Sequence, residues 1–179
     1  MNLHLIRHAR RVVGFMSVAF FVFLVAFSVV TNLTPLTGRQ LFVIIGGSME
    51  PTIPIGSLVV VTPTDPSAIV PGDIITVRAD NGVVVTHRVS RIADQPDGRA
   101  FEMKGDANQS PDGGLVPSRA IVGVVALSIP YAGYARAFLS TTSGMIAAIA
   151  FLGVLYLIHR VLGIAEAPAT PAKVRPIST

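Results

Sequence analysis

The segment from Asp73 to Ile92 reads DIITVRADNGVVVTHRVSRI, and it decides how the central part of the chain folds. Its two halves, 73–78 and 83–92, are rich in β-branched residues, which favour extended strands. Between them, Asp80-Asn81-Gly82 is typical of a tight turn that joins antiparallel strands. The segment therefore predicts a β-hairpin and, with it, an antiparallel sheet.

Further strands are predicted on both sides of this hairpin. Apolar and β-branched runs are separated by clusters of Pro, Gly, Asp and Asn, whereas helical periodicity is scarce. The runs lie at 41–45, 58–62, 101–104 and 121–127. We therefore expect a mainly β fold, with one small antiparallel domain in the centre of the chain.

Two long uncharged runs flank this central region. The first, 12–33, is long enough at about 1.5 Å per residue to cross a hydrocarbon core of about 30 Å, which predicts a transmembrane helix. A cleaved signal peptide is the alternative, but its apolar region is usually about 7–15 residues long. The second run, 137–158, also predicts a span, although its polar start leaves a shorter span or a surface helix open.

The charges indicate how the chain is oriented in a membrane. Arg7, Arg10 and Arg11 precede the first run and Arg160 follows the second, so the positive-inside rule places both ends in the cytoplasm. Residues 36–140 carry eight basic and nine acidic side chains, so no nucleic-acid-binding face is expected. The chain has no cysteine, which excludes disulfides and cysteine-ligated metals.

These observations predict five regions. They are a basic cytoplasmic segment (1–11), a transmembrane helix (12–33), an extracytoplasmic β-rich domain (36–136), a second transmembrane helix (137–158) and a disordered cytoplasmic tail (159–179). The expected location is thus a cell membrane that the chain crosses more than once.

The segment Gly46-Gly47-Ser48-Met49-Glu50-Pro51 contains a candidate nucleophile. Ser48 follows a flexible glycine pair and an apolar run, and Pro51 prevents the turn from continuing as a helix. Such a turn can present a reactive hydroxyl, with Gly47, Met49 and Pro51 as candidates for supporting the substrate or an oxyanion. An ordinary loop is the competing interpretation.

A serine nucleophile needs a base, and two residues of the central region are candidates. His87 is the only histidine there, and it lies on a predicted strand among apolar neighbours. Lys104 is the only lysine there, but a lysine base must be neutral, and the adjacent Asp106 would favour its charged form. His87 is therefore the preferred base.

A third group should orient the histidine, as a carboxylate does in Ser-His-Asp chemistry. Asp106 and Asp112, in a turn rich in Gly and Pro, are the candidates, although aspartates in such turns often bind their own backbone. One histidine with scattered aspartates has no metal-ligand spacing, so neither a metal nor another cofactor is expected.

Four short sequences that follow the first apolar run resemble, in kind and in order, those of type I signal peptidases. The resemblance is closest to the archaeal and endoplasmic-reticulum branch (peptidase family S26B-like), which has a histidine where the usual bacterial enzymes have a lysine. It covers roughly residues 12–130. The sequences are Ser48-Met49-Glu50-Pro51, Gly72-Asp73-Ile74-Ile75, Thr86-His87-Arg88-Val89 and Lys104-Gly105-Asp106-Ala107-Asn108 with Asp112.

The resemblance implies a membrane-anchored serine endopeptidase that cleaves signal peptides of exported preproteins after small residues. It assigns Ser48 as nucleophile and His87 as base, with Asp112 orienting His87 and Asp106 holding the turn, or with these two roles exchanged. Many relatives have a small hydroxyl residue where this chain has Gly46, so the second oxyanion donor is open. The implied partners are signal peptides and the lipid bilayer.

Two other functions fit parts of the sequence. A non-catalytic membrane-anchored β module would keep the fold and act as a binding or assembly subunit. A self-cleaving Ser-Lys protease of the repressor type would need a lysine at the position of His87 and would lack membrane spans. Accessory subunits are not predictable from the sequence.

Overall fold

A computed structural model describes residues 3–96 and 98–166 of the chain. The described residues divide into two compact units. The β unit comprises residues 27–144, and the helical unit comprises the residues before 27 and after 144. Each unit is described separately below.

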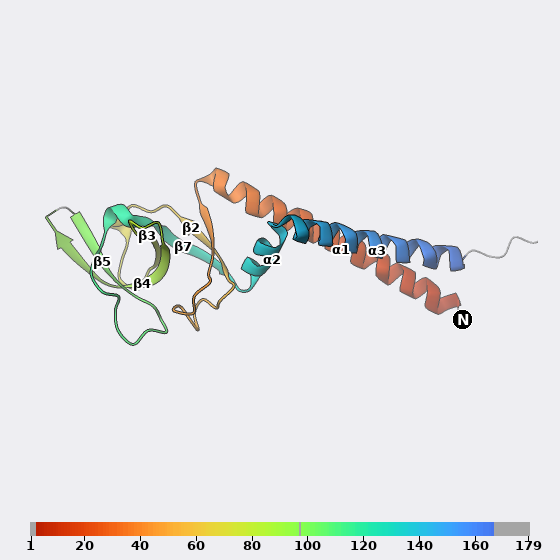
Figure 1. Ribbon diagram of the computed structural model, residues 1–179, viewed down its shortest axis with the longest axis horizontal. Helices are drawn as coiled ribbons and strands as arrows, with labels where there is room; N and C mark the ends of the chain where they lie inside the picture. Colours follow the sequence, from red (N-terminus) through yellow and green to blue (C-terminus); the bar gives the residue numbers. More distant parts are fainter. Residues whose placement is uncertain (1–2, 97, 167–179) are drawn as a thin grey trace, which may run out of the picture. The chain divides into compact units, whose positions relative to one another are not determined.

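The β unit contains a seven-stranded sheet in which every pairing is antiparallel (Figure 1). The strand order is β1-β2-β7-β3-β4-β5-β6, and the sheet curves into a half-barrel. The mainly β fold that the sequence predicted, with an apolar helix at each end of the chain, is confirmed. The strands are β1 (Gln40–Val43), β2 (Leu58–Thr62), β3 (Ile74–Arg78), β4 (Val84–Gln95), β5 (Gly98–Lys104), β6 (Val116–Pro117) and β7 (Ile121–Ile129).

The predicted hairpin joins β3 to β4. Gly82 has a φ of 82°, in the left-handed region that glycine adopts without steric cost. The turn is closed by hydrogen bonds from the Gly82 N–H to the Ala79 carbonyl and from the Val83 N–H to the Asn81 side chain. It sets the register in which His87 lies opposite Ile75.

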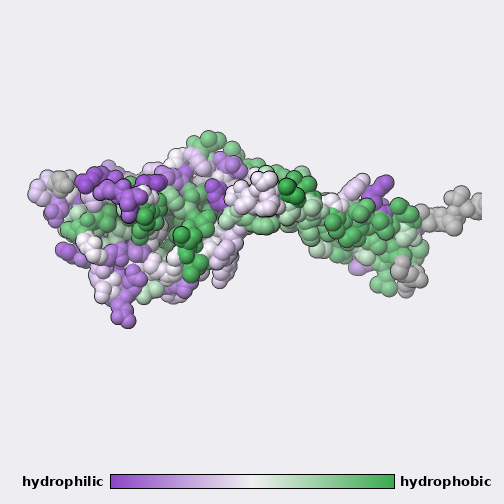
Figure 2. All heavy atoms as spheres, in the orientation of Figure 1, coloured by the Kyte–Doolittle hydropathy of each residue, from purple (hydrophilic) through white to green (hydrophobic). Residues whose placement is uncertain are grey.

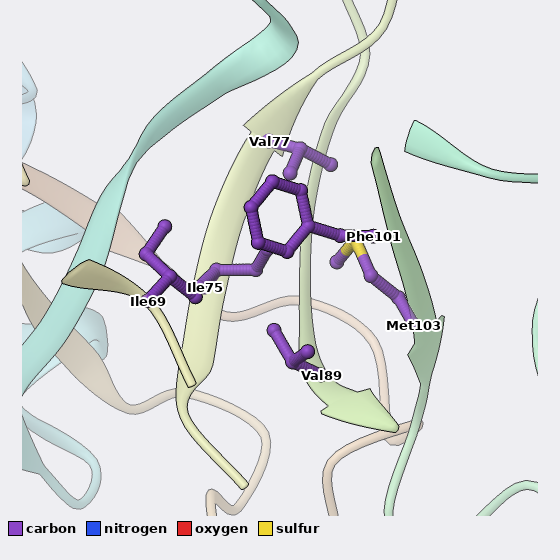
Figure 3. Packing of buried hydrophobic residues seen from close by; sticks show 6 residues of the cluster. All are labelled: Ile69, Ile75, Val77, Val89, Phe101 and Met103. Carbon is purple, nitrogen blue, oxygen red and sulfur yellow. The ribbon is translucent and has the colours of Figure 1, made fainter. Parts of the chain in front are cut away.

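Two hydrophobic clusters stabilise the sheet. In the larger one, the Phe101 ring lies among side chains from β3, β4 and β5, as Figure 3 shows. Its buried members are Ile69, Ile75, Val77, Val89, Phe101 and Met103. The second cluster is built from Met49, Ile53, Val59 and Val61, so the segment that contains Ser48 is anchored in the core by its own residues.

Three α-helices are present in the described residues: α1 (Leu3–Leu33), α2 (Ala132–Leu139) and α3 (Thr142–Glu166). Short 3-10 helices lie at Thr34–Thr37, Pro66–Ala68 and Ser118–Ala120. The apolar run predicted as one span at 137–158 is therefore divided between α2 and α3. The reason is that the Thr141 hydroxyl accepts a hydrogen bond from the Gly144 N–H at 3.0 Å and so caps the start of α3.

The end of α3 also differs from the prediction. The sequence predicted a disordered tail over 159–179, but residues 159–166 continue α3. The segment contains no proline, and its one glycine, Gly163, does not adopt the left-handed conformation that ends helices, so α3 continues to Glu166. The remainder of the predicted tail, 167–179, lies outside the described residues.

Both α1 and α3 are long and apolar enough to cross a membrane. Their surfaces are mostly hydrophobic in Figure 2. In the most apolar stretch of each helix, almost no residue is buried within the protein. Apolar side chains that no protein segment covers are costly in water, whereas a bilayer solvates them. The two helices therefore indicate a membrane protein.

Removing the Phe101 ring tests the importance of the larger cluster. Phe101 is 0% exposed, and Phe→Ala substitutions in cores cost about 3–5 kcal/mol. We expect Phe101→Ala to lower the unfolding temperature of the full chain in detergent by many degrees. Val70→Ala, at a position that is 54% exposed, should change it little. Equal unfolding temperatures for the two variants would contradict this assignment of the core.

Candidate active site

Ser48 lies in a turn that leaves β1 and is fixed on both sides. The Gly47 carbonyl accepts a hydrogen bond from the Glu50 N–H at 3.1 Å, and the Met49 carbonyl accepts one from the Ile53 N–H at 2.9 Å. Met49 and Ile53 are each only 1% exposed and pack into the second cluster. The serine is therefore held on a short turn whose next residues are buried anchors, and it lines a groove.

His87 connects Ser48 to Asp112. Its Nε2 lies 2.7 Å from the Ser48 Oγ, and its Nδ1 lies 2.5 Å from the Asp112 Oδ2. His87 comes from β4, Ser48 from the turn after β1, and Asp112 from the loop between β5 and β6. Three segments distant in sequence thus form one hydrogen-bonded line.

The chemistry of the acceptor sets the tautomer of His87. An ionised carboxylate can only accept hydrogen bonds, so the Nδ1 of His87 donates to Asp112. The Nε2 is then free to accept the proton of the Ser48 hydroxyl. This arrangement is the one that general-base activation of a serine requires.

Burial and the backbone hold this line in place. Only 10% of the His87 side chain and 29% of the Asp112 side chain are exposed to solvent. The Asp112 N–H donates to the Met103 carbonyl at 2.8 Å, which fixes the loop to β5. Shielding from water strengthens the attraction between the carboxylate and a protonated imidazole.

Asp106 has a different partner. Its carboxylate accepts hydrogen bonds from the Nε and Nη2 of Arg88 at 2.8 and 2.6 Å, and the Arg88 Nη1 donates to the Gly72 carbonyl. The Arg88 guanidinium holds the pKa of Asp106 below its ordinary value, with a smaller contribution from a hydrogen bond to Thr52. The same bond raises the pKa of Arg88. Asp106 is therefore an ion-pair partner that stays ionised.

The turn that carries Asp106 also supports the backbone of Ser48. The Ala107 N–H donates to the Ser48 carbonyl at 2.8 Å. A Cβ atom at Gly105 would lie 2.6 Å from the same carbonyl oxygen, so only glycine allows this close approach. The Arg88–Asp106 pair thus fixes the turn at residues 105–107, and this turn positions Ser48.

Lys104 lies away from the hydrogen-bonded line. It is opposite Arg88 in the β4–β5 register, so its side chain leaves the same face of the sheet as that of Arg88. His87 precedes Arg88 and therefore points to the other face. Lys104 lines a separate hollow of about 240 Å³ together with Arg88 and Asp106.

A groove of about 590 Å³ runs past Ser48 and His87. Its walls are mostly apolar and come from the end of β1, the serine turn and the start of β4. Of the residues predicted to support a substrate, Met49 lines the groove, whereas Gly47 and Pro51 do not. The lining residues are Phe42, Val43, Ile44, Ile45, Gly46, Ser48, Met49, Val83, Val84, Val85, Thr86 and His87.

Sequence reasoning missed the partner of Asp106 and the roles of Gly105 and Ala107. One signal was available for Arg88: the residue after a strand histidine must point to the opposite face, where it needs a partner of its own. No local signal linked Ala107 to the Ser48 carbonyl. Among residues 3–96 and 98–166, no cluster of three or more His, Asp or Glu side chains could hold a metal ion.

Comparison with known proteins shows a similarity to a curated protein. No protein-family model matches the chain. The chain is similar to signal peptidase I W of Bacillus subtilis (strain 168), with 41% identity over 76 residues, which cover 42% of this chain and 40% of that protein. The match thus spans less than half the length of the relative. The similarity supports the resemblance to type I signal peptidases and suggests a serine peptidase.

The Arg88–Asp106 pair makes stability depend on pH. Because the folded-state pKa of Asp106 is lowered from 3.8, the pair stabilises the fold fully above that pH and loses its effect as the pH falls through the folded-state pKa. Asp106→Asn should therefore lower the free energy of unfolding at pH 7, and the difference from the wild type should shrink below about pH 4. Chemical denaturation across this pH range measures it.

Asp80→Asn, at an exposed turn position, serves as the matched control and should leave the pH profile unchanged. A difference between Asp106→Asn and the wild type that stays constant from pH 7 to pH 3 would contradict the assignment.

Proposed function

We propose that this chain is a membrane-anchored serine endopeptidase that removes signal peptides from exported preproteins, cleaving after small residues. The observation that carries the proposal is the hydrogen-bonded line from Ser48 through His87 to Asp112 beside an apolar groove. The similarity to signal peptidase I W and the two apolar helices support it. The histidine base is the feature that favours the S26B-like branch.

In the proposed reaction, the Ser48 Oγ attacks the substrate carbonyl while its proton passes to the Nε2 of His87. Asp112 remains ionised and stabilises the imidazolium. His87 then gives the proton to the leaving amine, and an acyl-enzyme forms on Ser48. A water molecule, deprotonated by His87, hydrolyses this ester and regenerates the serine.

The developing oxyanion needs hydrogen-bond donors, which are worth most in a site shielded from water. The backbone N–H of Ser48 is the donor that the turn supplies. Gly46 contributes no side chain, and a Cβ atom at this position would meet no other atom within 4 Å. The space for a side-chain donor at position 46 is therefore open.

An extended substrate can pair with free strand edges on both walls of the groove. The Ile44 N–H donates to the carbonyl of Ser57, the residue before β2. Main-chain N–H and C=O groups alternate in direction along a strand, so those of Val43 and Ile45 point away from β2. The Val89 N–H bonds to Asp73, so on β4 the groups of Val84 and Thr86 face away from β3.

Val43, Ile45, Val84 and Thr86 all line the groove. A peptide strand bound between β1 and β4 would gain main-chain hydrogen bonds from these edges, while the apolar walls would favour apolar side chains.

We further propose a topology in which the basic ends of α1 and α3 lie in the cytoplasm and the β unit lies on the outer side of the membrane. In this arrangement residues 1–11 and those after 158 are cytoplasmic, and the domain at 36–136 meets preproteins that share the same bilayer. Confinement to one surface raises the effective concentration of a membrane-bound substrate.

The direct test replaces each group of the hydrogen-bonded line in the full-length protein. We expect Ser48→Ala and His87→Ala each to lower kcat/KM for preprotein processing by about 10⁴-fold or more. Lys104→Met should keep substantial activity because its side chain leaves the opposite face of the sheet. Processing is measured by gel shift and by the new N-terminus of the product.

Undiminished activity of His87→Ala would contradict the proposal. Absence of processing in the wild type, with preproteins that carry A-x-A-like sites, would favour the non-catalytic binding module instead.

Gly46 provides a second test. A hydroxyl at this position would add a donor to the groove that Ser48 lines without a clash, because the space around a Cβ atom there is open. We expect Gly46→Ser to raise kcat, by less than the roughly 10²-fold that removal of an oxyanion donor costs. Gly46→Ala fills the same space without a donor and should leave kcat unchanged. Equal kcat values for the two variants would show that a donor here does not reach the oxyanion.

A further inference from the structure

The helical unit contains an antiparallel contact between α1 and α3. The rings of Phe20 and Phe151 lie edge to face, with their centroids 5.1 Å apart. Further toward the chain termini, a Cβ atom at Gly14 would lie 3.2 Å from the His159 ring, and the His159 Nδ1 lies 3.2 Å from the Arg10 carbonyl. The helices therefore run side by side up to their polar ends.

Basic side chains of α1 lie on the same stripe as this contact. Arg7, Arg10, Arg11 and Gly14 have the spacing i, i+3, i+4 and i+7, which places them on one face of a helix. On α3, Glu166 follows His159 by two helical turns and lies on the facing stripe. The polar groups of both helices thus converge at one end of the pair.

These side chains surround a hollow of about 270 Å³, lined by Arg7, Arg10, Arg11, His159 and Glu166. Glu166 accepts from the Arg7 Nε at 2.9 Å and from the Arg10 Nη1 at 3.0 Å. Within residues 3–96 and 98–166, Arg11 takes part in none of the ion pairs. Three guanidinium groups therefore face one carboxylate, which leaves an excess of positive charge in the hollow.

The hollow lies where the apolar parts of the two helices end. The uncharged run of α1 starts at Val12, directly after Arg11, and that of α3 ends at Ile158, directly before His159. If α1 and α3 cross a bilayer, these boundaries lie at the level of the lipid headgroups. Half of the Arg7 side chain and 41% of the Arg10 side chain are exposed, so an external anion can reach them.

We propose that this hollow binds the phosphate group of an anionic phospholipid, with Arg7, Arg10 and Arg11 as its ligands. Guanidinium groups bind phosphate oxygens through paired N–H donors, and basic pockets between membrane helices suit such headgroups. The acyl chains of the lipid would lie against the apolar surfaces of α1 and α3, which free phosphate cannot do. Glu166 competes with the phosphate for Arg7 and Arg10.

The competition predicts opposite effects for two kinds of variant. The full-length protein in neutral detergent is titrated with dioleoyl phosphatidylglycerol or dioleoyl phosphatidylcholine, and bound lipid is measured by native mass spectrometry. We expect selective retention of phosphatidylglycerol. The double variant Arg10→Gln, Arg11→Gln should weaken its binding by about tenfold or more, since each basic residue contributes roughly fivefold. Glu166→Gln should strengthen binding several-fold because it frees two guanidinium groups.

Matched controls change the same charges elsewhere. Arg39→Gln and Asp80→Asn lie outside the helical unit and should leave the affinity unchanged. Circular dichroism at 222 nm checks that the helices of each variant are intact. Because the readout is lipid binding, it does not depend on the proposed peptidase activity.

Three results would overturn the proposal. They are equal retention of the two lipids, binding that does not respond to the Arg10→Gln, Arg11→Gln variant, and weaker binding in Glu166→Gln. Inorganic phosphate is added as a further arm. If it displaces phosphatidylglycerol at similar concentrations, the hollow is a site for free phosphate and the lipid assignment fails.

Discussion

His87 and Arg88 are neighbours on β4, and the alternation of side chains along a strand sends them to opposite faces of the sheet. On one face, His87 bonds to Ser48 and Asp112. On the other face, Arg88 holds Asp106, whose turn supports the Ser48 carbonyl through the Ala107 N–H. A single strand thus fixes both the side chain that would activate the serine and the backbone that positions it. A slip of one residue in the β3–β4 register would exchange the two faces and abolish both contacts.

The two aspartates of the β5–β6 loop differ in what surrounds them. Asp106 is bound to a guanidinium, which keeps it ionised and structural. Asp112 is bonded to the imidazole of His87, so its charge can stabilise a proton on that ring. Lys104 leaves the same face of the sheet as Arg88, so it also lies away from His87 and Ser48. The geometry therefore places Asp112 in the hydrogen-bonded line and Arg88 and Asp106 in a supporting ion pair, while Lys104 lies outside the line.

The apolar helices α1 and α3 raise a different question, namely what determines how two apolar segments pair and orient. Apolar surface alone does not specify a partner inside a bilayer, since lipid chains are equally apolar. In the helical unit, close contact at Gly14, the Phe20–Phe151 ring pair and the Arg–Glu166 ion pairs provide that specificity. These contacts place the excess of arginine at one end of the pair, where an anionic lipid would complete the charge balance that Glu166 leaves incomplete.

By itself, the sequence determined the strands near 58–62, 73–78 and 121–127, the hairpin at Asp80-Asn81-Gly82 and the apolar helices, because β-branched runs, turn residues and uncharged runs act locally. It also singled out Ser48 and His87, since few reactive side chains were available. Only the tertiary structure decided which aspartate meets His87, which holds Arg88, and why residue 105 is glycine. The physical reason is that these contacts join segments far apart in sequence, and their geometry depends on sheet register and curvature, which no local pattern encodes.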